Sequence, residues 1–160
     1  MTRALLQAVH VGAWALCYGA ITYTYYRLNG QMRCFVRSDD EYEGFAAATA
    51  NGLHWWILGT TALAGATGVT LAIWTPAPPA PDIVVLPFLL GVKTVFLFAL
   101  IAVQFHVSRV MWPRRARAPR NTWPSERRRF FWVAYLMGFL LIAQLVLGAL
   151  VRAVTDHAAF

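Results

Sequence analysis

The chain has 160 residues, of which 59% are hydrophobic and only 13% are charged. That composition is too apolar for a soluble domain of this size and predicts one integral membrane domain. The formal net charge of +7 would suggest nucleic-acid binding in a soluble chain. Here the arginines are positioned as the topology of a membrane protein requires, which explains the positive charge. We therefore expect no nucleic-acid partner.

Four apolar runs are long enough to cross a bilayer as helices. They cover residues 4–26, 53–74, 83–112 and 130–151. A helix needs about 20 residues to cross a hydrocarbon core about 30 Å thick. The sequence therefore predicts an all-α fold in which residues 1–160 form a single membrane domain, an integral four-helix bundle. The first run is too long and too aromatic for a signal peptide, so we expect it to be retained.

The arginines gather on one side of this bundle. Because the number of spans is even, the two termini and the proline-rich turn after the second span share one side, and the 27–43 and 112–129 loops share the other. All arginines except Arg3 and Arg152 fall on the loop side. By the positive-inside rule that side is cytoplasmic, which places both termini on the non-cytoplasmic side of a bacterial-type inner membrane. Binding of anionic lipid or of an acidic ligand is the alternative role for these arginines.

Lys93 and three histidines lie inside the apolar runs, where ionisable groups cost about 2.5–3.5 kcal/mol or more and usually mark a functional site. Counted from the centre of each run, His10 and Lys93 lie roughly 7 Å and 6 Å toward the termini. His54 and His106 lie roughly 14 Å and 13 Å toward the arginine-rich side. The sequence therefore predicts two polar levels, and a single iron cannot take ligands from both.

Two histidines on separate helices at one level can hold a b-type haem. His54 and His106 are accordingly candidate axial metal ligands, and Arg109, one turn after His106, is a candidate cofactor-binding cation. Interhelical hydrogen bonding or an interfacial position is the alternative for each histidine. Lys93 has no Asp or Glu within the predicted spans, so it must lose its proton, bind a non-protein anion such as a haem propionate, or reach water.

Helical spacing predicts which faces point into the bundle. Gln104 and Gln144 could extend the polar face near Lys93, and we expect both to form hydrogen bonds between helices. In the first run, one inward stripe is formed by His10, Trp14, Cys17 and Ile21.

The segments LLQAVHVGAW and GVKTVFLFALIAVQFHVSRVMWPR resemble the first and third helices of the HemJ-type haem-binding protoporphyrinogen IX oxidases and of the related CopD-like domains. The first has a histidine near a tryptophan, and the second has a lysine, then a histidine, then a basic end. The resemblance implies a b-type haem, with His10 and Lys93 as the functionally important, catalytic pair, His10 also as a haem ligand, and His106 as the third-helix histidine. It also implies oxidation of a porphyrin precursor, with a quinone as electron acceptor.

Three classes of function stay open. The first is a haem b-binding membrane redox protein, either an oxidase or an electron carrier toward quinone. The second is a non-catalytic subunit of a larger membrane complex, or a homo-oligomer, in which Lys93 and the histidines bind partner helices or pigments, with membrane lipid around them. The third is copper handling, for which the soft ligands are scattered over several depths. These are Met32, Cys34, Met111 and Met137.

Overall fold

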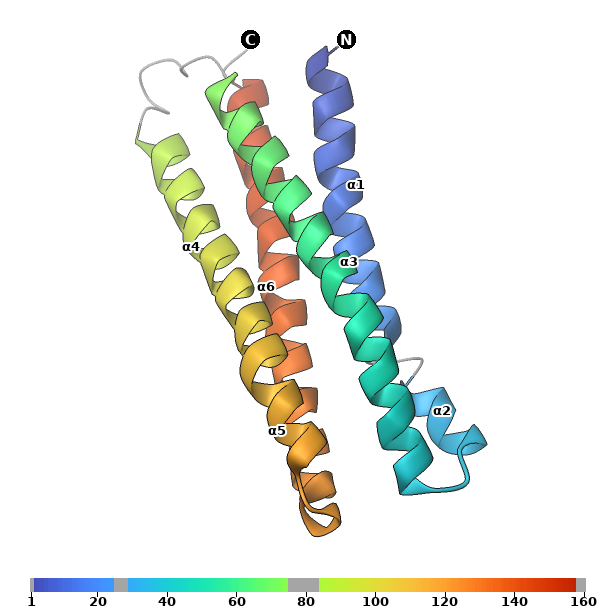
Figure 1. The fold of residues 1–160 in the computed structure, drawn as a ribbon. Coiled ribbons are helices and arrows are strands. Elements are labelled where there is room, and N and C mark those ends of the chain that lie inside the picture. Colours follow the sequence, from blue (N-terminus) through green and yellow to red (C-terminus); the bar gives the residue numbers. More distant parts are fainter. Residues whose placement is uncertain (1, 25–28, 75–83, 158–160) are drawn as a thin grey trace.

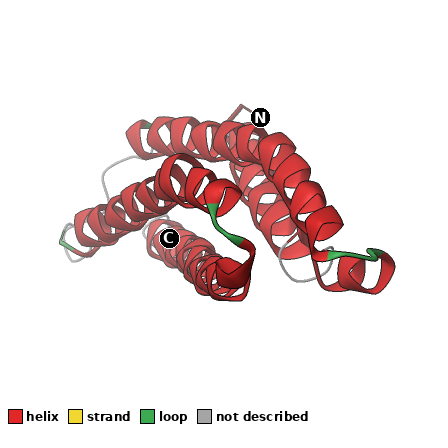
Figure 2. Ribbon diagram, turned by 60° about the horizontal axis from the view of Figure 1, so that its bottom comes forward, coloured by secondary structure: helices red, strands yellow, loops and turns green. Residues whose placement is uncertain are grey.

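The structure is a computed structural model that describes residues 2–24, 29–74 and 84–157. Every regular element in these ranges is a helix, and short connections join them (Figure 2). Four helices are long and apolar enough to cross a membrane, which confirms the predicted helical class and number of spans. The long helices are α1 (Thr2–Thr22), α3 (Asp39–Ile73), α4 (Val85–His106) and α6 (Trp123–His157). The short ones are α2 (Asn29–Phe35), the π-helical η3 (Val107–Met111), α5 (Trp112–Arg117) and the 3₁₀-helical η4 (Arg120–Thr122).

The four long helices form two antiparallel pairs (Figure 1). α1 packs along α3, and α4 packs along α6, while α1 also contacts α6 and α3 contacts α4 to a smaller extent. The start of α1 and the end of α6 lie at the same end of the bundle. α2 and α5 lie at the opposite end, which carries the arginine-rich loops.

The interior is a core of small, branched, aromatic and methionine side chains. The predicted inward stripe of α1 is confirmed, since all four of its residues are buried. Large apolar side chains on the outer surface, such as Phe88, Phe98 and Phe105 of α4, are more than half exposed. Only 11% of the most apolar stretch of the span that begins with α4 is buried, against 28% for each of the other three spans, so this span is the least covered by the rest of the bundle.

The second span begins much earlier than predicted. α3 starts at Asp39 instead of residue 53, and Ser38 caps it by accepting a hydrogen bond from the Glu41 N–H at 3.2 Å. The Glu41 carboxylate accepts in turn from the Arg37 N–H at 2.8 Å, a reciprocal arrangement close to a capping box. Hydropathy located the part of α3 that suits lipid, whereas the helix continues into polar sequence because its cap and its alanines favour helix there.

The third span also differs from the prediction. The helix continues through residues 85–117 and widens into a π-helical turn at η3, where the Trp112 N–H bonds to the Val107 carbonyl oxygen. Such a turn accommodates one extra residue and changes the direction of the side chains that follow. The predicted start at Ile83 and the proline-rich turn lie outside the described residues. α6 extends beyond the predicted 130–151 at both ends.

Candidate functional site

His10 is buried where α1 packs against α3. Its Nδ1 lies 2.9 Å from the Ala64 carbonyl oxygen and 3.0 Å from the Thr67 hydroxyl oxygen. Because a carbonyl oxygen only accepts, Nδ1 of the neutral ring carries the proton, and Nε2 keeps its lone pair. A Cβ on Gly68 would lie 3.0 Å from His10 Cε1, so the ring can pack this closely only against glycine. The structure thus holds His10 Nε2 in a fixed direction.

Lys93 approaches the same region from α4. It lies close enough to His10 for the two side chains to interact electrostatically, in agreement with their predicted common level. Its Nζ lies 3.4 Å from the position that a Cβ on Gly148 would take. Gln144 Nε2 donates to the Lys93 carbonyl oxygen at 2.8 Å, which confirms the interhelical hydrogen bond predicted for this glutamine. No carboxylate of the described residues forms an ion pair with Lys93.

A second polar region lies at the arginine-rich end, where the two helix pairs diverge. A cavity of about 360 Å³ lies there between α3 on one side and α4, η3, α5 and α6 on the other. A mostly apolar wall with a few polar groups is typical of a small-molecule site. The apolar lining includes Leu53, Ile57, Val107, Trp112, Phe130 and Met137, and the polar lining includes His54, Gln104, Ser108, Arg115 and Arg127.

Gln104 is a polar side chain of this cavity whose whole amide group lacks hydrogen-bond partners. It is 4% exposed, and neither its amide nitrogen nor its amide oxygen has a hydrogen-bond partner. The interhelical hydrogen bond predicted for it is therefore not formed. A buried polar group left unpaired costs about 1–3 kcal/mol, so this position calls for an explanation.

His54 faces the cavity from α3 and contacts Ser108 of η3. Its Nδ1 lies 2.6 Å from Ser108 Oγ, and the Ser108 hydroxyl donates to the Gln104 carbonyl oxygen at 2.9 Å. Because the serine proton is already committed to that carbonyl, His54 Nδ1–H donates to Ser108 Oγ, and His54 Nε2 keeps its lone pair. The interhelical hydrogen bond that we held open for His54 is thus present.

His106 and Arg109 lie outside this cavity. Both side chains are exposed, and the Arg109 guanidinium lies 5.8 Å from the centre of the Phe105 ring. Residues two apart differ by about 200° around a helix, so Ser108 and His106 face opposite directions. The structure therefore brings His54 to Ser108, and it does not bring His54 and His106 together as an axial pair.

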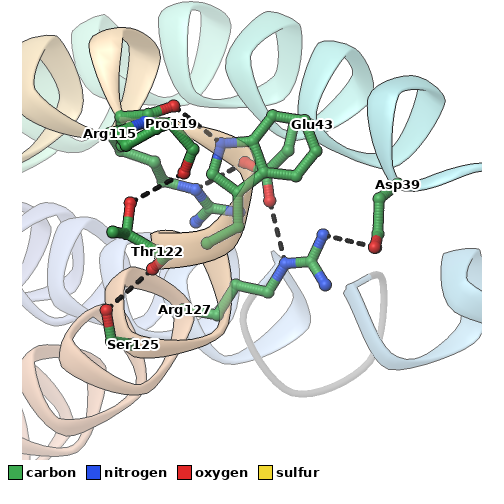
Figure 3. A network of polar contacts seen from close by, with 9 residues as sticks. Asp39, Glu43, Arg115, Pro119, Thr122, Ser125 and Arg127 are labelled. Atoms are coloured by element: carbon green, nitrogen blue, oxygen red, sulfur yellow. Dashed lines mark hydrogen bonds and ion pairs between the residues drawn. The ribbon is translucent and has the colours of Figure 1, made fainter.

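The arginine-rich end contains an ion-pair network that the sequence analysis missed (Figure 3). Glu43 of α3 accepts from Arg115 Nε at 2.6 Å and from Arg127 Nε at 2.8 Å. Arg127 also binds Asp39 at 2.7 Å, and its guanidinium lies 4.7 Å from the centre of the Tyr42 ring. These bonds join α3 to α5 and α6 beside the cavity. The signal in the sequence that could have predicted these ion pairs is the acidic run DDEYE, which lies on the same side of the bundle as the basic clusters.

The charge state of Glu43 follows from its position. It lies roughly 15 Å along the helix from residue 53, where the predicted apolar span begins, and so outside the membrane-spanning part of α3. Burial alone would raise the pKa of its carboxyl, but the hydrogen bonds and charges of Arg115 and Arg127 outweigh burial and hold the pKa below its ordinary value. The network is therefore ionised at neutral pH.

The hydrogen bonds of two histidines each engage Nδ1 and leave Nε2 with its lone pair. Proteins orient a metal-ligating histidine by bonding its other ring N–H to a carbonyl or a similar acceptor, which is the arrangement of both His10 and His54. A b-type haem needs only one or two such nitrogens. Among the residues that the structure describes, no group of three or more His, Cys, Asp or Glu side chains is placed to hold a metal ion.

The soft ligands named for copper lie in different surroundings. Met111 and Met137 are buried in the core, whereas Cys34 is exposed on α2. Comparison of the chain with models of protein families, with curated proteins and with solved structures found no match.

Proposed function

We propose that this protein is a haem b-binding membrane redox protein with HemJ-like chemistry, which oxidises a porphyrin precursor or passes electrons toward a quinone. The observation that carries the proposal is the geometry of His10. A buried neutral imidazole, fixed by a backbone carbonyl and within electrostatic range of a lysine, is the arrangement expected of a histidine that would bind haem iron near a bound anionic group.

The residues around His10 have separate roles in this proposal. The haem supplies one-electron chemistry when it is bound. His10 Nε2 would bind the iron, and the Ala64 carbonyl keeps the ring in the tautomer that this would require. Lys93 offers the positive charge that a propionate or a substrate carboxylate needs, and that anion relieves the cost of an unpaired ammonium group in a membrane bundle. His54 is a second candidate ligand at the other level.

The absorbance spectrum of the purified protein tests the haem proposal. We expect a Soret band in the absorbance spectrum of the full chain, its loss in His10→Ala, and its shift or weakening in Lys93→Met. His106→Ala is the matched control, because this exposed histidine should leave the spectrum unchanged. A folded protein that stays colourless after growth with added haem precursor would remove the proposal.

A second function is favoured by the surface of α4. Of the four spans, the one that begins with α4 has the least buried apolar stretch, so other chains of a larger membrane complex could cover it. In that case the chain would be an accessory subunit or a homo-oligomer, and it would co-purify with other chains without a redox spectrum of its own. Blue-native electrophoresis of the detergent extract separates this outcome from the first.

A further inference from the structure

We propose that the cavity at the arginine-rich end binds the headgroup of a lipid-soluble quinone, held by Gln104 and His54. The role of the quinone as an electron acceptor rests on the proposed function, whereas the binding site is argued from the cavity alone. The cavity lies on the level of His54, away from the His10 and Lys93 cluster, so the two sites can be tested separately.

Gln104 is the reason to expect a ligand. Its amide is almost fully buried, lines the cavity and has both polar atoms unpaired. Buried amides in folded proteins nearly always have partners, since leaving one unpaired costs about 1–3 kcal/mol. Gln144, the other glutamine buried in the bundle, donates to a backbone carbonyl through its amide nitrogen, so only its amide oxygen is unpaired. A ligand with both accepting and donating groups would complete the bonding of Gln104.

The charges around the cavity favour an uncharged ligand. Its two arginines, Arg115 and Arg127, form ion pairs with Glu43 and Asp39, which balance their charges, and only Arg115 Nη2 is buried without a hydrogen-bond partner. An anionic ligand would therefore compete with carboxylates held at 2.6–2.8 Å. A neutral headgroup meets no such competition.

The remaining groups match the two redox states of a quinone. A quinone carbonyl accepts a hydrogen bond from the Gln104 amide nitrogen. A quinol hydroxyl donates to the Gln104 amide oxygen or to the lone pair of His54 Nε2, which the bond to Ser108 leaves available. The aromatic side chains of Trp112 and Phe130, whose ring centroids lie 4.8 Å apart with the planes inclined at 56°, provide apolar surface for the quinone ring.

The experiment is a titration of the purified full chain in nanodiscs with a short-tailed benzoquinone. Quenching of tryptophan fluorescence is the readout, and Trp112→Phe identifies the cavity tryptophan as its source. We expect saturable binding whose Kd rises about tenfold in Gln104→Leu, because one hydrogen bond to the headgroup is lost. His54→Leu should weaken binding of the quinol more than binding of the quinone. Gln144→Leu, the matched control, should bind as the unchanged protein does.

Gln104→Leu has a second readout that does not depend on the ligand. Replacing an unpaired amide by an apolar group of similar size should keep or raise the melting temperature of the empty protein, so weaker quinone binding cannot be attributed to misfolding. The quinone site is overturned if Gln104→Leu binds the quinone as tightly as the unchanged protein does. It is also overturned if an alkyl alcohol with the same tail displaces the quinone, because binding would then depend on the tail and not on the headgroup. If the protein shows a Soret band but no saturable quinone binding, the quinone site is rejected and the haem proposal stands. If it binds quinone but shows no Soret band, the haem proposal is rejected and the quinone site stands.

Discussion

The His10 imidazole packs against the bare backbone of α3, and the space there is set by one glycine. We predict that Gly68→Ala destabilises the protein by about 1–3 kcal/mol, the usual effect of overpacking, because the added Cβ would lie 3.0 Å from His10 Cε1. The shift of the ring by a few tenths of an ångström would also strain its bond to the Ala64 carbonyl. Thermal unfolding in detergent measures the change.

Gly65→Ala is the matched control for this substitution. It lies on the same helix, but its added Cβ would meet only Leu97 Cδ2, at 3.8 Å, which is an ordinary contact. We expect Gly65→Ala to leave the melting temperature unchanged or to raise it slightly through better helix propensity. Equal effects of the two substitutions would show that the close packing of His10 does not matter for stability.

At the residue scale, depth along the helix was predictable from sequence, but direction around it was only partly so. Counting residues placed His10 and Lys93 at one level, and the structure brings them within electrostatic range. The same count placed His106 level with His54, yet His106 points outward, and Ser108 takes the position beside His54. Depth depends only on the rise per residue, whereas direction also depends on which neighbour each face meets.

At the scale of elements, the polar first turns of α3 serve to connect the two helix pairs. Arg115 and Glu43 are 7% and 14% exposed, so removing one charge leaves the other buried without its partner. We predict that Glu43→Gln lowers the free energy of unfolding by about 3 kcal/mol. Asp40→Asn is the control: the pair of Asp40 with Arg120 is 53% and 77% exposed, and such surface pairs contribute about 0–1 kcal/mol.

The pH dependence of this loss is a second test of the same network. Because the folded pKa of Glu43 lies below its ordinary value of 4.5, its stabilising effect is complete above that pH and is lost as pH falls through the folded pKa. The difference in melting temperature between the unchanged protein and Glu43→Gln should therefore be constant near neutrality and shrink below about pH 4.5. If the difference in melting temperature stayed the same down to strongly acidic pH, Glu43 would not be the ionised partner of Arg115 and Arg127.

The early start of α3 shows why hydropathy alone predicted the beginning of this helix at the wrong residue. Apolar content marks where a helix suits lipid, and polar helical turns outside lipid leave no such mark. The signal that was available is local, namely Ser38 followed three residues later by Glu41, the spacing of a capping box. The π-helical turn of η3 has no comparable signature in the sequence, and two of its residues, Val107 and Ser108, line the cavity.

For the whole molecule, the number of spans followed from sequence, but the pairing of helices did not. Membrane helices are apolar on lipid-facing and buried faces alike, so periodicity distinguishes the two weakly. α1 pairs with α3 and α4 with α6, and the contact of α1 with α3 includes the close packing of His10 on Gly68. The cavity follows from that pairing, because it lies where the pairs diverge.

The arrangement of cysteines lets the orientation of the whole molecule be measured without engineering a new site. Cys34 is exposed on α2, at the arginine-rich end, and Cys17 is fully buried. If the arginines obey the positive-inside rule, a membrane-impermeant maleimide should label Cys34 in inverted vesicles and leave it unlabelled in intact spheroplasts. Cys34→Ser is the control, and it should abolish labelling in both preparations. Labelling of Cys34 in intact spheroplasts would reverse the topology and place both termini in the cytoplasm.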